Sequence, residues 1–227
     1  MPVAATPFGG GQSTGACIHW PILHDSLRAM HLTLKRLTIA GLLLCCQSIH
    51  AGHAISITTA HKSERERASA AQLDRLLNSH DVSRWAFTQK VVIDEHQIPH
   101  SHPVLTLHAR HLNDDDVLLS TYVHEQLHWF LSARAPQMDA AASALRAIYP
   151  RIPVGFPEGS SDEEGNYVHL VIAYLEHQAM KTLLGEQKAA QVQQFLAKDH
   201  YTWIYSTVSK EPEKVGAVIK AHGLLPP

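Results

Sequence analysis

The chain has 227 residues, which suits one domain of moderate size, or less if the N-terminus is removed. Its net charge is −2, from 19 Lys+Arg and 21 Asp+Glu, so nothing in the composition favours a nucleic-acid partner. Histidine is frequent, with 18 residues, so a histidine pair needs supporting context before it indicates a metal site.

The N-terminal region has the layout of an exported protein. Residues 1–29 show no periodicity, and we read them as an unstructured, over-extended reading frame. Residues 30–54 resemble a secretory signal peptide, with a short basic stretch, an apolar run at 37–46 and small residues after it. The apolar run is too short to span a bilayer. We therefore expect Met30 to be the true start, and residues 55–227 to be a periplasmic or secreted domain with no stable membrane span.

Cysteine use limits the chemistry of the mature domain. The chain has 3 cysteines, Cys17, Cys45 and Cys46, and all of them precede the expected cleavage. No disulfide framework or thiolate ligand would remain after processing. A metal site in the mature domain must therefore use His, Asp or Glu.

The first part of the mature domain predicts a small sheet. Residues 61–80 form an amphipathic helix pattern with a charged start. Two segments, 85–94 and 104–110, have the β-branched and alternating apolar residues of strands. The proline-bounded segment 95–103 between them predicts a turn.

Several histidines gather around that turn. The segment 96–111 contains five of them: His96, His100, His102, His108 and His111. A second metal site is one interpretation, but histidines on a turn do not fix ligand geometry as a helix does. We therefore expect exposed loop and strand-face histidines.

The segment Thr121–Phe130 contains the motif H-E-x-x-H, at His124, Glu125 and His128. Residues four apart lie on one face of a helix, so the two imidazoles can bind one metal ion, with the carboxylate placed to act on a water molecule. The flanking residues are apolar on both sides, which indicates a buried helix. Buried ionisable groups are costly unless they are paired or bound to metal.

This segment resembles the active-site helix of the zincin metallopeptidases. The resemblance implies a zinc ion held by His124 and His128, with Glu125 as the general base, and it covers only this helix and one more. In zincins the strand before this helix usually forms the edge on which substrate lies, and 104–110 is in the right order for that role. The expected fold is α+β and mainly helical, with a small N-terminal sheet and the motif helix packed on a second buried helix.

The chain after the motif helix predicts a loop between helices. Ala135–Pro136 is expected to stop the motif helix, and 138–149 has the pattern of an amphipathic helix. Residues 150–166 are rich in Gly, Pro, Ser and acidic residues, typical of a lid, a binding wall or a plain solvated connection. The C-terminal part, beyond residue 185, reads as two or three amphipathic helices, in which Trp203 and Tyr205 are expected to be packing residues.

Residues 167–184 form the second strongly apolar helix pattern, and they carry His169 and Glu176 on one face. A hydrolytic zinc site needs three protein ligands, and neither the short motif with a third histidine nor the N-E-x-x-x-D pattern is matched. Two assignments stay open. Either His169 is the third ligand and Glu176 orients a ligand imidazole, which we prefer, or Glu176 is the ligand and His169 contacts substrate.

The sequence therefore predicts an exported zinc peptidase acting on a peptide or protein substrate. Glu125 would take a proton from water and pass it to the leaving amine. The group that stabilises the oxyanion stays open among Tyr167, Tyr174 and His177. The alternatives are a non-catalytic exported zinc-binding protein and a zinc hydrolase that acts on amides other than peptides.

Overall fold

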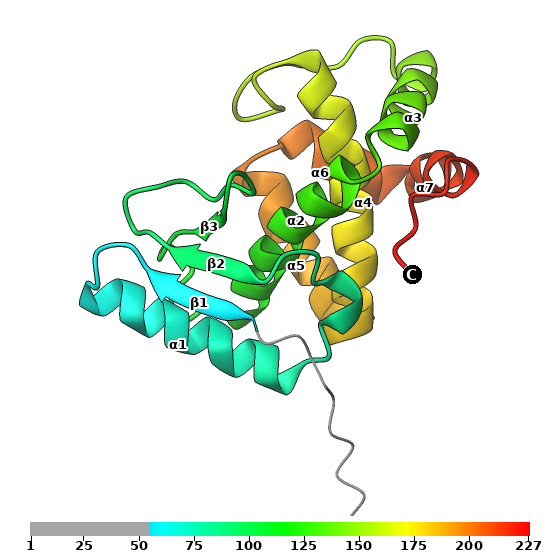
Figure 1. Cartoon of the computed structure of the whole chain (residues 1–227). Helices are drawn as coiled ribbons and strands as arrows, with labels where there is room; N and C mark the ends of the chain where they lie inside the picture. The colour runs from blue at the N-terminus through cyan, green and yellow to red at the C-terminus, as the bar shows by residue number, and fades with distance from the viewer. Residues whose placement is uncertain (1–54) are drawn as a thin grey trace, which may run out of the picture. The chain divides into compact units, whose positions relative to one another are not determined.

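The computed structural model describes residues 55–227, so the expected signal peptide and all three cysteines lie outside the described residues. The described part is mainly helical with one small sheet, as expected (Figure 1). The elements in chain order are β1 (Ser56–Thr59), α1 (Glu64–Ser79), a 3-10 turn η1 (Ser83–Trp85), β2 (Lys90–Ile93), β3 (Leu105–Leu107), α2 (Asp115–Ser132), α3 (Ala135–Ile148), α4 (Glu163–Leu184), α5 (Glu186–Asp199), α6 (Thr202–Lys210) and α7 (Pro212–Ala221).

The sheet has three parallel strands in the order β1-β2-β3. The sequence predicts only two of these strands. The third, Ser56–Thr59, has four residues and is too short for an alternating pattern, although its Ile and Thr residues favour a strand. The expected strand 85–94 is shorter than predicted, since Trp85 ends η1, residues 86–89 are irregular and β2 begins at Lys90. A parallel pair needs a crossover, and α1 supplies the one between β1 and β2.

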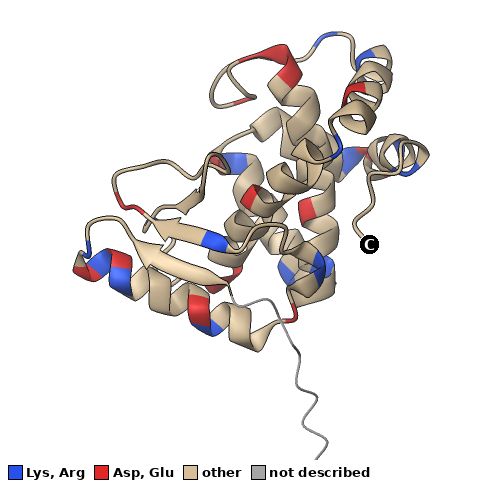
Figure 2. Ribbon diagram, in the orientation of Figure 1, with Lys and Arg blue, Asp and Glu red and all other residues tan. Residues whose placement is uncertain are grey.

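Helix α1 begins with a capping box. The Ser63 hydroxyl accepts from the Glu66 N–H at 3.1 Å, and the Glu66 carboxylate accepts from the backbone N–H groups of His61, Ser63 and Glu95. Glu66 therefore joins the start of α1 to the residues that follow β1 and β2. The charged residues of α1 alternate in sign along it (Figure 2), while its apolar residues pack on the sheet.

Helix α2 packs against α1, β3 and α4, so it connects the sheet with the helical part of the domain. The buried amide of Gln126, inside the H-E-x-x-H motif, accepts from the N–H groups of Phe87 and Thr88 and donates to the Thr88 carbonyl. These bonds fix the segment before β2 against α2. The expected packing of the motif helix on a second buried helix, α4, is confirmed.

Two expected boundaries are wrong, each for a local reason. Pro136 does not terminate a helix: α2 already ends at Ser132, and Pro136 lies in the first turn of α3, where its missing N–H costs nothing. Helix α4 begins at Glu163 instead of Tyr167, because the Asp162 carboxylate caps it by accepting from the Gly165 N–H at 2.7 Å.

The outer edge of β3 is not free along its length. The Thr106 N–H donates to the His100 carbonyl at 2.8 Å, and the His100 N–H donates to the Thr106 carbonyl at 3.1 Å. The expected substrate-binding edge at 104–110 is therefore occupied at its centre by the preceding loop.

Candidate metal centre

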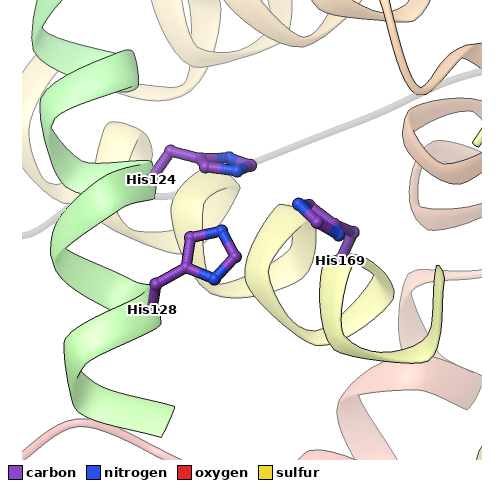
Figure 3. Close-up of side chains that lie close together, drawn as sticks. All are labelled: His124, His128 and His169. Atoms are coloured by element: carbon purple, nitrogen blue, oxygen red, sulfur yellow. The ribbon is translucent and has the colours of Figure 1, made fainter. Parts of the chain in front are cut away.

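Helix α2 presents the motif residues from its buried middle. Asp114 caps the helix by accepting from the Val117 N–H at 3.2 Å, and Asp115 and Asp116 in the first turn favour the same start. His124 and Glu125 are buried, with 7% and 6% of their surfaces exposed. One helical turn further along, His128 points to the same side as His124 (Figure 3).

Helix α4 brings the third histidine. Its His169 ring faces the two rings of α2 (Figure 3), and the three side chains offer nitrogen atoms that lie within 4.8 Å of one another. The ring centroids form a nearly equilateral triangle, at 5.3 Å for His124–His128, 5.5 Å for His124–His169 and 5.1 Å for His128–His169. The three histidines are therefore positioned to hold one metal ion.

Hydrogen bonds orient two of these rings. The Nδ1–H of His124 donates to Glu176 Oε2 at 3.0 Å, and the Nδ1–H of His169 donates to the Gly165 carbonyl at 2.7 Å. Both bonds leave Nε2 as the lone-pair nitrogen directed to the centre of the triangle. The tautomers follow from these acceptors, since a carboxylate or carbonyl oxygen accepts and the ring N–H donates.

Burial keeps all three imidazoles neutral, which is the form that binds metal. It lowers the pKa of His124 to about 3, with His200 adding to the effect. Burial and the neighbouring histidines lower the pKa of His128 to about 2, and burial with His124 lowers that of His169 to about 3. Because the three imidazoles are uncharged, they do not repel a cation, and each has a nitrogen lone pair that can coordinate one.

Glu176 lies beneath His124 and makes a buried hydrogen-bond network. Its Oε1 accepts from the Ser120 hydroxyl at 2.6 Å, and its Oε2 accepts from the Tyr205 hydroxyl at 2.9 Å as well as from His124. Both carboxylate oxygens are thus engaged with protein groups. Of the two open assignments, this geometry favours His169 as the third donor and Glu176 as the group that orients His124.

Glu125 has no such partner set, and it faces the cavity beside the triangle. Burial raises the pKa of Glu125 to about 8, and the Glu176 carboxylate contributes in the same direction. A carboxyl group whose pKa lies near neutrality is suited to take and return a proton. Glu125 is thus available for chemistry, whereas both carboxylate oxygens of Glu176 already accept hydrogen bonds from protein groups.

The triangle opens into a cavity of about 930 Å³. This volume is at the upper end of the range of ligand sites, about 300–1,000 Å³. Its wall comes from six parts of the chain: the loop before β3, the residues that follow β3, α2, the loop before α4, α4 itself, and α5 with the start of α6.

The junction of α5 with α6 supplies three cavity residues that the sequence analysis missed: His200, Tyr201 and Tyr205. The Tyr201 ring lies 4.2 Å from that of His169 and stacks at 8° on His124, at 6.4 Å. Its backbone has φ 50° and ψ 39°, a left-handed conformation that costs a non-glycine residue roughly 1–2 kcal/mol. Strain of this kind is concentrated at functional sites.

Tyr205 is buried in the core, as expected of a packing residue, and its hydroxyl also donates to Glu176 Oε2 at 2.9 Å. The carboxylate of the preceding residue, Asp199, orients His200, whose Nδ1 lies 2.9 Å from Asp199 Oδ2. Asp199 in turn pairs with Arg110. No motif marks these residues, since their approach to α2 depends on how α6 turns back over α4.

The three expected oxyanion donors do not line the cavity. The Tyr167 hydroxyl donates to the Tyr149 carbonyl at 2.9 Å, and Tyr174 packs against Gly216 of α7. His177 borders a separate small space between α4 and α5. All three lie on faces of α4 that turn away from the triangle.

The histidines of the β2–β3 region divide into two groups. His96 and His102 are exposed, as expected, and His102 stacks on Trp129 at 4.2 Å. His111 is buried, contrary to our expectation, and with His100 and His108 it lines the cavity. This burial lowers the pKa of His111 to about 4, with His108 and Arg110 adding to the effect.

A second group that could hold a cation consists of His61, Glu66 and Asp94. Glu66 already accepts three backbone N–H groups at the start of α1, and His61 Nε2 lies 3.2 Å from Asp94 Oδ1. These interactions account for the cluster as part of the fold.

No known protein family, curated protein or solved structure matches this chain.

Proposed function

We propose that this chain is an exported zinc-dependent metallopeptidase that hydrolyses peptide bonds. The observation that carries the proposal is the arrangement of His124, His128 and His169 around one point, beside Glu125 and at the base of a ligand-sized cavity. A site used only for zinc binding has no need of a carboxylate beside the ligands and open to the cavity. The buried, oriented imidazoles fit zinc, which takes three histidine ligands in hydrolases and keeps a further position open.

His124, His128 and His169 would hold the ion, with Glu176 and the Gly165 carbonyl keeping two of the rings in place. Zinc supplies Lewis-acid chemistry at such a site, by lowering the pKa of water and polarising a carbonyl group. Neutral imidazoles leave the positive charge of the ion undiminished. The protein contributes the orientation of the ligand imidazoles.

Glu125 carries the proton. It takes one from water as the water oxygen bonds to the carbonyl carbon of the scissile peptide. The carbon–nitrogen bond then breaks, and Glu125 returns that proton to the leaving nitrogen. The products are a carboxylic acid and an amine, which become a carboxylate and an ammonium when the acid proton passes to the amine, and Glu125 ends as the carboxylate it began as.

Tyr201 is the best-placed donor to the oxyanion that develops on the carbonyl oxygen. Its ring lies 4.2 Å from that of His169, and it lines the same cavity as Glu125. Burial, with the charge of Glu125, raises the pKa of Tyr201 above its usual value, so the hydroxyl keeps its proton and can donate it in a hydrogen bond.

Export is part of the proposal and depends on the basic, apolar and small-residue pattern of residues 30–54. Within residues 55–227, no helix is sufficiently long and apolar to cross a membrane. N-terminal sequencing of the exported protein should find a start near residue 52 or 55. Recovery of an intact N-terminus would contradict this part of the proposal.

The replacement Glu125→Gln tests the proposed reaction. The amide keeps the size of the side chain but cannot take a proton, so kcat on a peptide substrate should fall by ~10²–10⁴-fold while bound zinc stays the same. Zinc content and kcat are measured on the same preparations of wild type and variant. Unchanged turnover in Glu125→Gln would refute the mechanism.

A further inference from the structure

The two most exposed large apolar side chains of residues 55–227 both line the cavity. They are Phe156, at 81% exposure, and Ile98, at 78%. Isolated apolar side chains on a surface are common and need no explanation. Two at the mouth of one ligand-sized cavity are instead typical of a binding site.

Phe156 is held in its exposed position by the helix that carries His169. The buried Asn166 side chain accepts from the Ser160 N–H at 2.6 Å and donates to the Pro153 carbonyl at 2.8 Å. These two bonds close the loop on either side of Phe156. The loop also packs so tightly on Asn166 that a Cβ at Gly159 would lie 2.4 Å from its Oδ1.

The same loop is attached to the segment that carries Tyr201. The N–H of Thr202 donates to the Pro157 carbonyl at 2.9 Å, and the N–H of Trp203 donates to the Glu158 carbonyl at 3.1 Å. Phe156 is thus positioned from two elements of the site, α4 and α6. The loop backbone on both sides of Phe156 is therefore held in place by the fold.

Ile98 is held from the other side by the helix that carries His128. The Trp129 indole N–H, one residue after that ligand, donates to the Ser101 carbonyl at 2.8 Å. The His100 ring Nδ1 lies 2.9 Å from the Ile98 carbonyl, and the His100 backbone pairs with β3. In the view of Figure 1 this loop and the loop before α4 lie on the same side of α2, and both border the cavity.

Charge does not select the ligand at this mouth. Residues 98–101 and 155–157 contain no Lys, Arg, Asp or Glu. Arg110, which lines the cavity, is already paired with Asp199 through the two terminal nitrogens of its guanidinium group, Nη1 and Nη2. A ligand therefore gains most by placing apolar side chains against Phe156 and Ile98.

We infer that the substrate is an extended peptide with bulky apolar side chains next to the scissile bond, and that Phe156 and Ile98 select for them. This inference rests on the proposed peptidase function and names its substrate class. The two side chains are specificity residues, and they take no part in proton transfer. Burying a large apolar side chain is worth roughly 1.5–3 kcal/mol, which corresponds to about 10–100-fold in kcat/KM.

Two quenched fluorogenic peptides of equal length test the inference. One carries Leu and Phe on either side of the scissile bond, and the other carries Ser and Gln. Wild type should cleave the apolar peptide at least about 10-fold better in kcat/KM. Phe156→Ser and Ile98→Ser should each reduce that preference several-fold while leaving zinc content and melting temperature unchanged.

Ile148→Ser is the matched control, because Ile148 is also exposed, at 41%, but lies at the end of α3 outside the cavity wall. It should leave the preference intact. Equal cleavage of the two peptides by wild type, or an unchanged preference in both cavity variants, would overturn the inference while the peptidase function stands.

Binding separates this result from a failure of the function itself. Titration calorimetry on zinc-loaded Glu125→Gln measures affinity for the same two peptides without turnover, and the apolar peptide should bind at least about 10-fold more tightly. Wild type that cleaves neither peptide, together with this binding preference, would contradict the peptidase function alone. Absence of the binding preference would overturn the inference. Tighter binding of an N-acyl amino acid, a non-peptide amide titrated in the same way, than of the apolar peptide would overturn it as well.

Discussion

Two of the three metal-facing histidines, His124 and His169, rely on a second group that the spacing of the motif does not reveal. His124 relies on Glu176, and His169 relies on the Gly165 carbonyl. The positions of His124, Glu125 and His128 could be predicted, since helical spacing brings the two histidines to one face and the motif places the carboxylate next to the first. His169 and Glu176 could be placed on one face of a second helix, but their separate roles depend on the distance between α2 and α4.

Glu176→Gln should weaken zinc affinity by ~10–100-fold without removing a ligand. The amide cannot accept from Ser120, His124 and Tyr205 with both of its ends, so the His124 ring loses part of its support. Competition with a chelator of known affinity measures the change. Glu186→Gln is the matched control, because its side chain is 82% exposed, on α5; equal affinity in the two variants would contradict the orienting role.

Tyr201 could not be predicted, since its importance comes from a left-handed backbone at the α5–α6 junction and not from a motif. Tyr201→Phe should lower kcat by about 10²–10³-fold, with KM and zinc content nearly unchanged, because an oxyanion donor acts mainly in the transition state. Steady-state kinetics on the apolar peptide measures both parameters.

Tyr205→Phe provides the contrast for Tyr201, since the Tyr205 hydroxyl is bound to Glu176. That variant should change zinc affinity more than kcat. A Tyr201→Phe enzyme that loses zinc but keeps kcat when saturated with metal would assign Tyr201 a structural role.

At the scale of elements, the long apolar helices were predictable and their ends were not. α2 and α4 are evident because each is apolar over several turns. The start of α4 was missed because the acidic stretch before it reads as a loop until the Asp162 cap is recognised. Strand β1, with four residues, is too short to be distinguished from a loop by its pattern alone.

Asn166 shows how α4 determines the shape of the loop before it. Asn166→Ala would leave the Ser160 N–H and the Pro153 carbonyl without their partner, which should reduce the free energy of unfolding by roughly 1–3 kcal/mol. Because the loop carries Phe156, kcat/KM on the apolar peptide should fall as well. Urea denaturation and kinetics measure the two effects.

Asn78→Ala is the control for Asn166, because the Asn78 side chain is exposed and bonds only to its own helix, at the Asp74 carbonyl. It should change stability by less than about 0.5 kcal/mol. Equal stability and equal kcat/KM in Asn166→Ala and wild type would contradict the proposed anchoring of the loop.

For the whole molecule, the class of fold could be predicted and the arrangement could not. The composition of segments indicated a small sheet followed by helices, and the structure has both. The parallel order β1-β2-β3 and the return of α6 over α4 depend on contacts between residues far apart in the chain. The cavity is therefore a property of the assembled domain, since its wall draws on residues from Ile98 to Tyr205.

The zinc content of the purified domain tests the central claim most directly. Wild type should hold about one zinc ion per chain, and His169→Ala should lose it, because two remaining histidines are too few ligands for a stable site. His177→Ala is the matched control on the same helix, since His177 lies outside the cavity wall. Wild type without bound zinc, or a His169→Ala variant that retains zinc as His177→Ala does, would contradict the account.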